Sequence, residues 1–305
     1  MVTFSFTILG SSSALPTSQR FPSAHLLNVN ERFFLVDCGE GTQMQLRKYK
    51  LKIGKINHIF ISHLHGDHTF GLFGLISTLG LLDKSSDLNI YAPPPLEQIV
   101  HDHLDAFDIH IPYRLVFRDL DCSKSEMIYE DKNLRVETIP LQHRIPTCGF
   151  LFHEKPGLRN IKKEAIEEFN IPVREIHRIK EGFDFTTESG EIIPNEQLTR
   201  EPQKPRSMAY CTDTLYTENV ITKIAGVDLL YHEATYMQDM ADQAKESFHT
   251  TSQQAAMLAK KSGVGKLVLG HFSARYKNLD LLLEEARKIF ENTFLAEDGA
   301  VFNID

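Results

Sequence analysis

One ten-residue stretch, Ile59 to His68, constrains this chain more than any other. It opens with β-branched and aromatic residues, which predict a buried strand. Four polar side chains then follow within six positions: His63, His65, Asp67 and His68. Side chains two apart in an extended strand point to the same side, so the first two histidines can reach one metal ion together. Gly66 permits a sharp turn, after which the aspartate and the third histidine can reach a second ion.

Packing alone does not explain this cluster. A single histidine at a strand end is usually solvated or packed in a core, but burying four such groups without a ligand would leave several costly polar atoms unpaired. Imidazole and carboxylate groups form the ligand set that zinc prefers. Two metal ions about 3.5–4 Å apart can clamp a phosphate or acyl ester during hydrolysis. The stretch therefore predicts a hydrolytic site with two metal ions.

Hydrophobic patterning predicts a mixture of strands and helices along the whole chain. Strands are expected at 2–9, 25–29, 32–36, 59–61, 87–91, 114–117, 125–129, 134–140, 147–153, 207–211, 227–231, 264–269 and 300–304. Helices are expected at 45–49, 69–82, 96–107, 253–261 and 279–290. A length of 305 residues allows one or two domains with a large core.

Bulk properties indicate a soluble protein of the cytoplasm. The first residues lack the basic region of a signal peptide, and the most apolar run, 70–82, is too short to span a bilayer. The four cysteines (Cys38, Cys122, Cys148 and Cys211) form no C-x-x-C pair, which predicts free buried thiols. A net charge of −8 disfavours nonspecific nucleic-acid binding, although a local basic patch or bound metal ions would still attract phosphate.

The H-x-H-x-D-H signature resembles that of the metallo-β-lactamase superfamily, and two further strings along the chain resemble its ribonuclease Z branch, the tRNA 3′-processing endonucleases. These strings are Asp37-Cys38-Gly39-Glu40-Gly41-Thr42-Gln43 and Gly270-His271-Phe272-Ser273-Ala274-Arg275-Tyr276. The resemblance implies an α/β fold, an αββα sandwich of two mixed β-sheets flanked by helices. It also implies a single domain over 1–305 that carries an inserted substrate-binding arm at 154–206.

The resemblance further implies two sets of metal ligands that share one aspartate. His63, His65, His143 and the bridging Asp213 would hold one ion, and Asp67, His68, Asp213 and His271 would hold the other. Every one of these residues stands at the end of a predicted strand or in the loop after it. The expected cofactor is two zinc ions per chain, and the same nitrogen and oxygen ligands accept Mn or Fe.

By the same resemblance, Glu233 and His249 form a catalytic pair, and Asp67 assists the nucleophile. The implied reaction is the removal of 3′ trailers from precursor tRNA by metal-hydroxide attack on the scissile phosphodiester, which leaves a free 3′-hydroxyl. One alternative keeps the metal site but acts on small phosphodiesters, sulfate esters or lactones, because a fold does not fix a substrate. Another is a non-catalytic RNA-binding or scaffold protein, whose signature would be lost ligands, and none is lost here.

Several local patterns have two interpretations. Asp37 can support a ligand histidine or cap the following helix. The loop 10–14 is a plain turn or, by the resemblance, a border of the catalytic cleft. Thr250 or Ser252 can cap the helix after His249. His101 and His103 look like a second metal motif, but on a helix residues two apart point about 200° apart, so no metal site is expected there.

The segment 154–206 differs from the rest because Pro and Gly interrupt it and charges gather in it. Between Lys155 and Lys180, seven basic residues stand beside four acidic ones, which indicates a locally basic stretch. The resemblance implies an arm that grips the tRNA body, often across a homodimer, with candidate RNA contacts at Lys162, Lys163 and Arg174 and a phosphate contact at Arg275. The usual Gly-Pro-rich run is reduced here to 170–174. A solvated helical excursion is therefore the second interpretation of this segment.

Overall fold

The computed structural model describes residues 3–305, and its contacts divide the chain into two compact units. The first unit comprises Met1–Tyr129, Val136–Phe152 and Arg206–Asp305. The second, called the arm below, comprises Glu130–Arg135 and His153–Pro205. Among the described residues, no helix is both long and apolar enough to cross a membrane.

The first sheet has seven strands in the order β18-β1-β2-β3-β4-β5-β6. Its strands β1, β2, β3 and β18 pair antiparallel, and β3 to β6 pair parallel. The turn between β2 and β3 is formed by Asn30 and Glu31, both with positive φ, which suits the right-handed twist of a hairpin. The strands are β1 Phe4–Gly10, β2 Ala24–Val29, β3 Arg32–Cys38, β4 Ile56–Phe60, β5 Leu88–Ala92, β6 Leu115–Asp119 and β18 Val301–Asn303.

The second sheet also has seven strands, in the order β17-β16-β15-β14-β9-β8-β7. Strands β14 to β17 are parallel, so their carboxyl ends lie at one edge of the sheet. The strands are β7 Met127–Glu130, β8 Leu134–Leu141, β9 Thr147–Glu154, β14 Ser207–Cys211, β15 Leu229–Glu233, β16 Leu267–Gly270 and β17 Thr293–Leu295.

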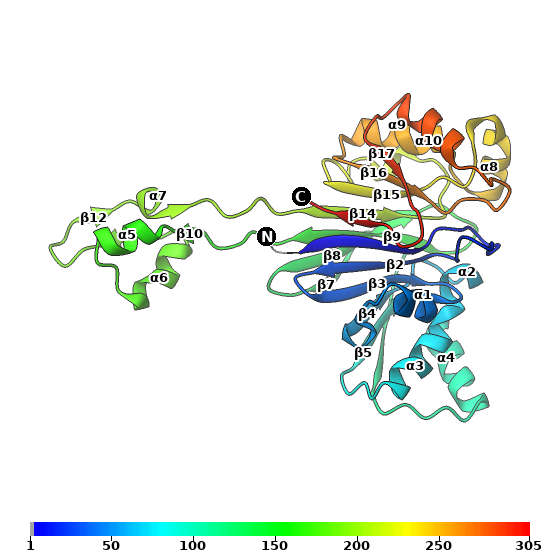
Figure 1. Ribbon diagram of the computed structural model, residues 1–305, viewed down its shortest axis with the longest axis horizontal. Coiled ribbons are helices and arrows are strands. Elements are labelled where there is room, and N and C mark those ends of the chain that lie inside the picture. Colours follow the sequence, from blue (N-terminus) through cyan, green and yellow to red (C-terminus); the bar gives the residue numbers. More distant parts are fainter. Residues whose placement is uncertain (1–2) are drawn as a thin grey trace. The chain divides into compact units, whose positions relative to one another are not determined.

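The two sheets face each other across an aromatic core, and helices cover their outer faces (Figure 1). Phe60 of the first sheet lies 5.4 Å from Phe150 of the second, ring centre to ring centre. Helices α1 Thr42–Lys48, α3 Gly71–Leu81 and α4 Pro95–Ala106 cover the first sheet, and α9 Ser252–Ser262 and α10 Asp280–Arg287 cover the second. The expected αββα sandwich of two mixed sheets is confirmed. Short elements complete this unit: α2 Gly66–Thr69, α8 Ala241–Ser247, η1 Ile53–Lys55, η2 Glu218–Val220 and η3 Gln238–Met240.

The arm is a small folded lobe with a core of its own. Its helices are α5 Lys163–Glu168, α6 Val173–Lys180 and α7 Asn195–Leu198, and its paired strands are β10 Asn160–Ile161 with β13 Thr199–Arg200 and β11 Phe185–Thr186 with β12 Ile192–Ile193. The buried residues of this core are Ala165, Ile171, Ile179, Phe185, Ile193 and Leu198. The segment is therefore more than a solvated excursion, because it buries apolar surface within itself.

The expectation of four free thiols is wrong for one pair. Cys122 and Cys148 form a disulfide, with their Cα atoms 5.0 Å apart. The sequence did not indicate this disulfide, because the two residues are 26 positions apart and are brought together only by the tertiary fold. Cys38 and Cys211 are free and buried, and burial raises the pKa of each thiol to about 12.

Candidate metal centre and catalytic pair

All the residues expected to bind metal lie in the first unit, where strand ends bring them together. The loop after β4 carries His63 and His65, and the short helix α2 carries Asp67 and His68. His143 follows β8, Asp213 follows β14 and His271 follows β16. Their ligand atoms form two adjoining groups, each with its members within 4.8 Å of one another: His63, His65, His143 and Asp213, and then Asp67, His68 and His271.

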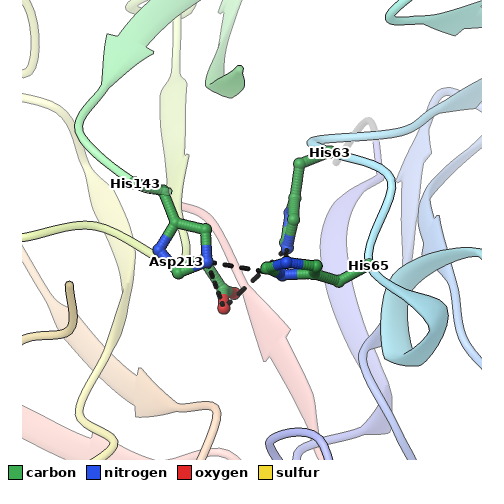
Figure 2. Close-up of side chains that lie close together, drawn as sticks. All are labelled: His63, His65, His143 and Asp213. Atoms are coloured by element: carbon green, nitrogen blue, oxygen red, sulfur yellow. Dashed lines mark hydrogen bonds and ion pairs between the residues drawn. The ribbon is translucent and has the colours of Figure 1, made fainter. Parts of the chain in front are cut away.

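Figure 2 shows the first group, in which three imidazoles and the Asp213 carboxylate converge. His63 Nε2 lies 2.9 Å from His65 Nδ1, which in turn lies 3.4 Å from His143 Nε2. Asp213 Oδ1 is 3.9 Å from Nε2 of both His63 and His143. Four such atoms around a common centre are the ligand number and type of a zinc site.

The second oxygen of Asp213 faces the second group. Its Oδ2 lies 3.1 Å from His68 Nε2 and 3.2 Å from His271 Nε2. Asp67 Oδ2 lies 3.5 and 3.4 Å from the same two nitrogens. The Asp213 carboxylate therefore stands between the groups, one oxygen on each, which is the arrangement that a bridging ligand needs.

The outer nitrogen of four of these histidines has a partner that fixes the ring. His63 Nδ1 lies 3.0 Å from Ser62 Oγ, His143 Nδ1 lies 3.1 Å from the Phe248 carbonyl, and His271 Nδ1 lies 3.0 Å from Thr235 Oγ1. His68 Nδ1 donates to Asp37 Oδ2 at 2.8 Å. Partners of this kind orient metal-binding imidazoles and leave Nε2 turned toward the ion. His65 differs, since its Nδ1 is the inward atom.

Asp37 has the supporting role and does not cap α1, whose N-cap is Gly41. Besides His68, the buried Asp37 carboxylate accepts hydrogen bonds from the Ser62 amide and hydroxyl and from the Tyr210 hydroxyl, at 2.7–2.9 Å. Its four donors fill the carboxylate and hold the loop before the first histidine. Of the two interpretations of Asp37, the structure supports the ligand-orienting one.

Three residues of the cluster and its support have a strained backbone conformation. Asp37, Asp213 and His271 each have positive φ, of 57°, 47° and 56°. Residues other than glycine rarely adopt this conformation, and it persists where surrounding contacts demand it, often at functional sites. Each of the three directs its side chain from a strand end into the cluster.

Buried carboxylates give the centre a negative potential that suits cations. Burial lowers the pKa of His68, but the carboxylates of Asp67, Asp213 and Asp37 raise it to well above its ordinary value. Burial raises the pKa of Asp213, and the surrounding histidines, His271 first, hold it well below its ordinary value. Such a buried set of carboxylates needs a compensating positive charge. The donor set, its convergence and its potential all fit two metal ions.

A second constellation adjoins the cluster and consists of His249 and Glu233. Glu233 ends β15 and is fully buried, and its Oε1 accepts from His249 Nδ1 at 3.0 Å. The amides of Thr214 and Thr250 and the hydroxyl of Thr235 also donate to this carboxylate, at 2.7, 3.1 and 2.6 Å. The glutamate is therefore rigidly held, and it in turn orients the imidazole.

Charge at this pair favours a protonated imidazole. Burial lowers the pKa of His249, but the Glu233 carboxylate and its hydrogen bond raise it, to a net value of about 9. Because Nδ1 is engaged by Glu233, Nε2 is the nitrogen left to face a substrate. The helix after His249 is capped by Thr251 in a capping box with Gln254, so the interpretation of Thr250 or Ser252 as the cap is wrong. Thr250 instead donates to the Thr214 carbonyl.

A cavity of about 450 Å³ opens onto the cluster. The loop 10–14 borders it, and the Ala14 amide donates to Asp67 Oδ2 at 2.7 Å, so this loop is part of the cleft. The lining residues are Ser13, Ala14, His65, Gly66, Asp67, Phe70, His143, Arg144, Asp213, Ser247, His249 and His271.

Sequence reasoning missed several of these neighbours. Ser62 and Thr235 lie directly beside predicted site residues and carry hydroxyl groups, which was the available signal. Phe70 and Arg144 line the cavity without any motif that marks them. Only the fold brings their side chains to its mouth.

The four candidate RNA contacts have different surroundings. In the arm, Lys163 and Arg174 are exposed, but the Lys162 ammonium donates to the carbonyls of Glu196 and Gln197 at the end of α7. The Arg275 guanidinium donates through Nε to Ser273 Oγ at 3.1 Å and lies over the Tyr236 ring, 4.9 Å from its centre. The basic balance before residue 181 is reversed after it, where residues 181–205 carry six acidic and two basic side chains.

Comparison with solved structures defines the class of the fold. The metallo-beta-lactamase fold protein YhfI from Bacillus subtilis superimposes with a TM-score of 0.69 over 99% of both chains, at 18% sequence identity. The chain thus has the metallo-β-lactamase fold, as its sequence signature implied.

Closer relatives give the family. The chain is 50% identical to the ribonuclease Z of Phocaeicola vulgatus over 100% of its own length and 99% of that protein, and 47% identical to that of Bacteroides fragilis (strain ATCC 25285) over 100% of both. The human tRNase Z, short form, superimposes with a TM-score of 0.72 over 99% of both chains, at 29% identity. The family described as Anti-Pycsar protein Apyc1 also matches residues 4–158. The chain belongs to the ribonuclease Z family.

Proposed function

We propose that this chain is a metal-dependent endoribonuclease that removes 3′ trailers from precursor tRNA and leaves a free 3′-hydroxyl on the tRNA. The observation that carries the proposal is the junction at Asp213, whose two oxygens face the two ligand groups while the His249–Glu233 pair stands beside them. The names of the relatives, ribonuclease Z and human tRNase Z, support the choice of substrate.

His63, His65, His143 and Asp213 would hold one zinc ion and Asp67, His68, Asp213 and His271 a second, and Mn or Fe suits the same ligands. Two ions held there would lower the pKa of a water molecule and neutralise charge on the phosphoryl oxygens. The second ion's group reaches its full number of protein ligands only if Asp213 serves both. Sharing of Asp213 would also keep the two ions close enough to act on one phosphate.

The remaining roles belong to side chains around the cavity. Asp67, whose Oδ2 is held by the Ala14 amide, would orient or deprotonate the attacking water. Protonated His249, oriented by Glu233, would donate the proton from Nε2 to the departing 3′-oxygen. Arg144 lines the cavity and Arg275 follows His271 in the chain, and both side chains are exposed for contact with phosphate.

The arm, in this proposal, contacts the body of the tRNA through Lys163 and Arg174. Lys162 would act indirectly, since its ammonium already bonds two carbonyls of the arm. We also propose that the protein is a homodimer and acts in the cytoplasm, where precursor tRNA is made in a bacterial cell. These last two statements rest on the family alone.

A second candidate function is hydrolysis of a small phosphodiester, sulfate ester or lactone at the same metal site. It is favoured by the charge of the arm, which is basic only before residue 181 and acidic after it. Over residues 153–205 the arm carries nine basic and eleven acidic side chains, and a segment without net positive charge is a poor electrostatic footprint for RNA.

The deciding experiment is cleavage of a 3′-extended precursor tRNA by the wild type, His65→Ala and His249→Ala. A single cut at the end of the acceptor stem, lost in both variants, is the expected result. Wild-type protein that leaves the tRNA intact but hydrolyses bis(p-nitrophenyl) phosphate, with dependence on His65, would instead establish the small-substrate function. Metal content measured on each sample separates a lost ion from a lost proton donor.

A further inference from the structure

Phe70 is an exposed aromatic side chain at the mouth of the metal cavity. It lines that cavity with the ligand residues His65, Asp67 and Asp213, and 64% of its surface is exposed. Phe70 lies between α2 and α3, and Leu72, two residues further on, is fully buried. Single exposed apolar residues are common on proteins, and it is the location of Phe70, in the cavity that the clustered histidines and aspartates line, that calls for a function.

The ring is held in place by the metal-binding loop itself. A Cβ atom added to Gly66 would lie 2.3 Å from Cε2 and 2.4 Å from Cζ of Phe70, which means that one part of the ring rests directly against the Gly66 backbone. The Phe70 amide donates to the Gly66 carbonyl at 2.9 Å, which fixes the backbone of the same pair. A ring anchored in this way loses little conformational freedom when a ligand stacks on it.

We propose that Phe70 is the stacking platform for the base of a nucleotide next to the scissile phosphate. This inference rests on the proposed action on RNA. A phosphodiester seated at the metal ligands places its flanking nucleosides at the cavity mouth, and every base offers a flat π-face to an aromatic ring. Stacking of this kind is worth roughly 1–3 kcal/mol per base and does not depend on sequence. It would hold the single-stranded end of the substrate in line with His249.

Phe107 provides a matched control. It is an exposed phenylalanine of the same unit, 68% accessible, but it follows α4 and is not among the residues that line the metal cavity. Substitution of Phe107 by leucine removes an exposed ring of equal size without touching the cleft. Phe70→Tyr is the conservative partner, because it keeps a ring at the position.

The test combines these variants with abasic substrates. Wild type, Phe70→Leu, Phe70→Tyr and Phe107→Leu, each loaded with metal, are compared on a 3′-extended tRNA and on two versions with an abasic nucleotide immediately before or after the cut. Phe70→Leu is expected to lower kcat/KM on the full substrate about 5- to 150-fold, the equivalent of 1–3 kcal/mol. Phe70→Tyr and Phe107→Leu should stay within about twofold of wild type. On one abasic substrate the wild type and Phe70→Leu should become equal.

A binding measurement gives a second readout. With 2-aminopurine at the stacked position and His249→Ala protein to keep the RNA uncut, binding should quench the fluorescence, and adding Phe70→Leu should abolish the quenching. Equal losses for Phe70→Leu on all three substrates would overturn the inference, as would a dimer that dissociates when Phe70 is replaced, because the ring would then be a subunit contact. Wild-type protein that cuts none of the tRNAs refutes the proposed function itself, which distinguishes the two failures.

Discussion

Two His-x-His pairs in this chain have the same spacing and different surroundings. His63 and His65 follow β4 in extended chain, and their ring centres lie 4.7 Å apart. His101 and His103 lie on helix α4, where residues two apart diverge around the axis. Among the described residues, the groups able to hold a metal include the first pair and not the second.

The helical pair has other partners. His101 Nε2 lies 3.9 Å from the exposed Glu97 carboxylate, one helical turn away. The His103 ring packs against Phe73 and Phe107, with ring centres 4.4 and 4.7 Å apart. The two imidazoles of this pair therefore contact different neighbours on different sides of α4. Backbone direction, rather than residue spacing, decides whether two imidazoles can share an ion.

The largest effect on activity is predicted for a substitution in the first pair, and a matched substitution in the second pair should have little effect. His65→Ala should lower kcat/KM on precursor tRNA by more than about 10³-fold, because metal ions supply several kcal/mol to the transition state. His103→Ala should stay close to wild type. Metal content by mass spectrometry should fall in the first variant only. Equal metal loss in both variants would contradict the distinction between the two pairs.

The sequence was sufficient to predict which histidines and aspartates converge and how the layers of the fold are arranged, because both depend on local rules. Each ligand follows a strand with clear alternation or a buried apolar run, and strand ends of one sheet lie at a common edge. The sequence was not sufficient for contacts that join distant segments. The support of His143 by the Phe248 carbonyl and the Cys122–Cys148 disulfide depend on tertiary packing, which no spacing reports.

In the arm, too, the sequence alone does not show which basic side chains are available to bind a ligand. Neighbouring Lys162 and Lys163 are equivalent in sequence, but the first ammonium is engaged by two carbonyls and the second residue is exposed. Residues 155–180 alone have more basic than acidic side chains. Residues 181–205, which are mainly acidic, belong to the same lobe and cancel that positive charge. The net charge of a short sequence segment can therefore differ in sign from the net charge of the folded unit that contains it.

The next effect in size concerns the support of the ligands. Asp37→Asn keeps the size of the side chain and the positive φ that asparagine tolerates. It replaces one acceptor oxygen with an amide group that faces four donors. We expect the affinity for the metal to fall about 10- to 100-fold, measured by titration with a competing chelator. An unchanged affinity would mean that His68 is oriented without Asp37.

A smaller effect is expected in the arm. Reversing the charge of Lys163 and Arg174 together should weaken tRNA binding several-fold and lower the dependence of log Kd on log salt by about two, one for each lost phosphate contact. Lys260→Glu combined with Lys288→Glu, on two exposed lysines of the sandwich, is the control for the same change in net charge. The comparison with Lys162→Ala is also informative, since that change should lower the thermal stability of the arm instead. A salt dependence that stays constant would exclude the arm from the RNA contact.

The smallest predicted effect is on the pH dependence of stability and concerns His58, which lies on β4, just before the histidine cluster. Its environment differs from those of both His-x-His pairs. Its ring packs in an aromatic cluster, 4.7 Å from Tyr129 and 5.4 Å from Phe34. Burial, then the nearby cations, lower the pKa of His58 to about 4. In the unfolded chain this group titrates near its ordinary pKa of about 6.5, so between these values the unfolded state binds more protons and stability falls as the pH falls.

His58→Gln lacks this titration. Urea unfolding at pH 7.5 and pH 4 should therefore show a wild type that loses more stability than the variant, by on the order of 2 kcal/mol once partial exposure is allowed for. The metal ligands are the same in both proteins, so their own titration cancels in the difference. An equal loss in both proteins would mean that His58 is protonated in the folded state at low pH without cost. In that case the aromatic cluster would tolerate a charge, and a histidine on this strand would need neither a metal nor a carboxylate to be accommodated.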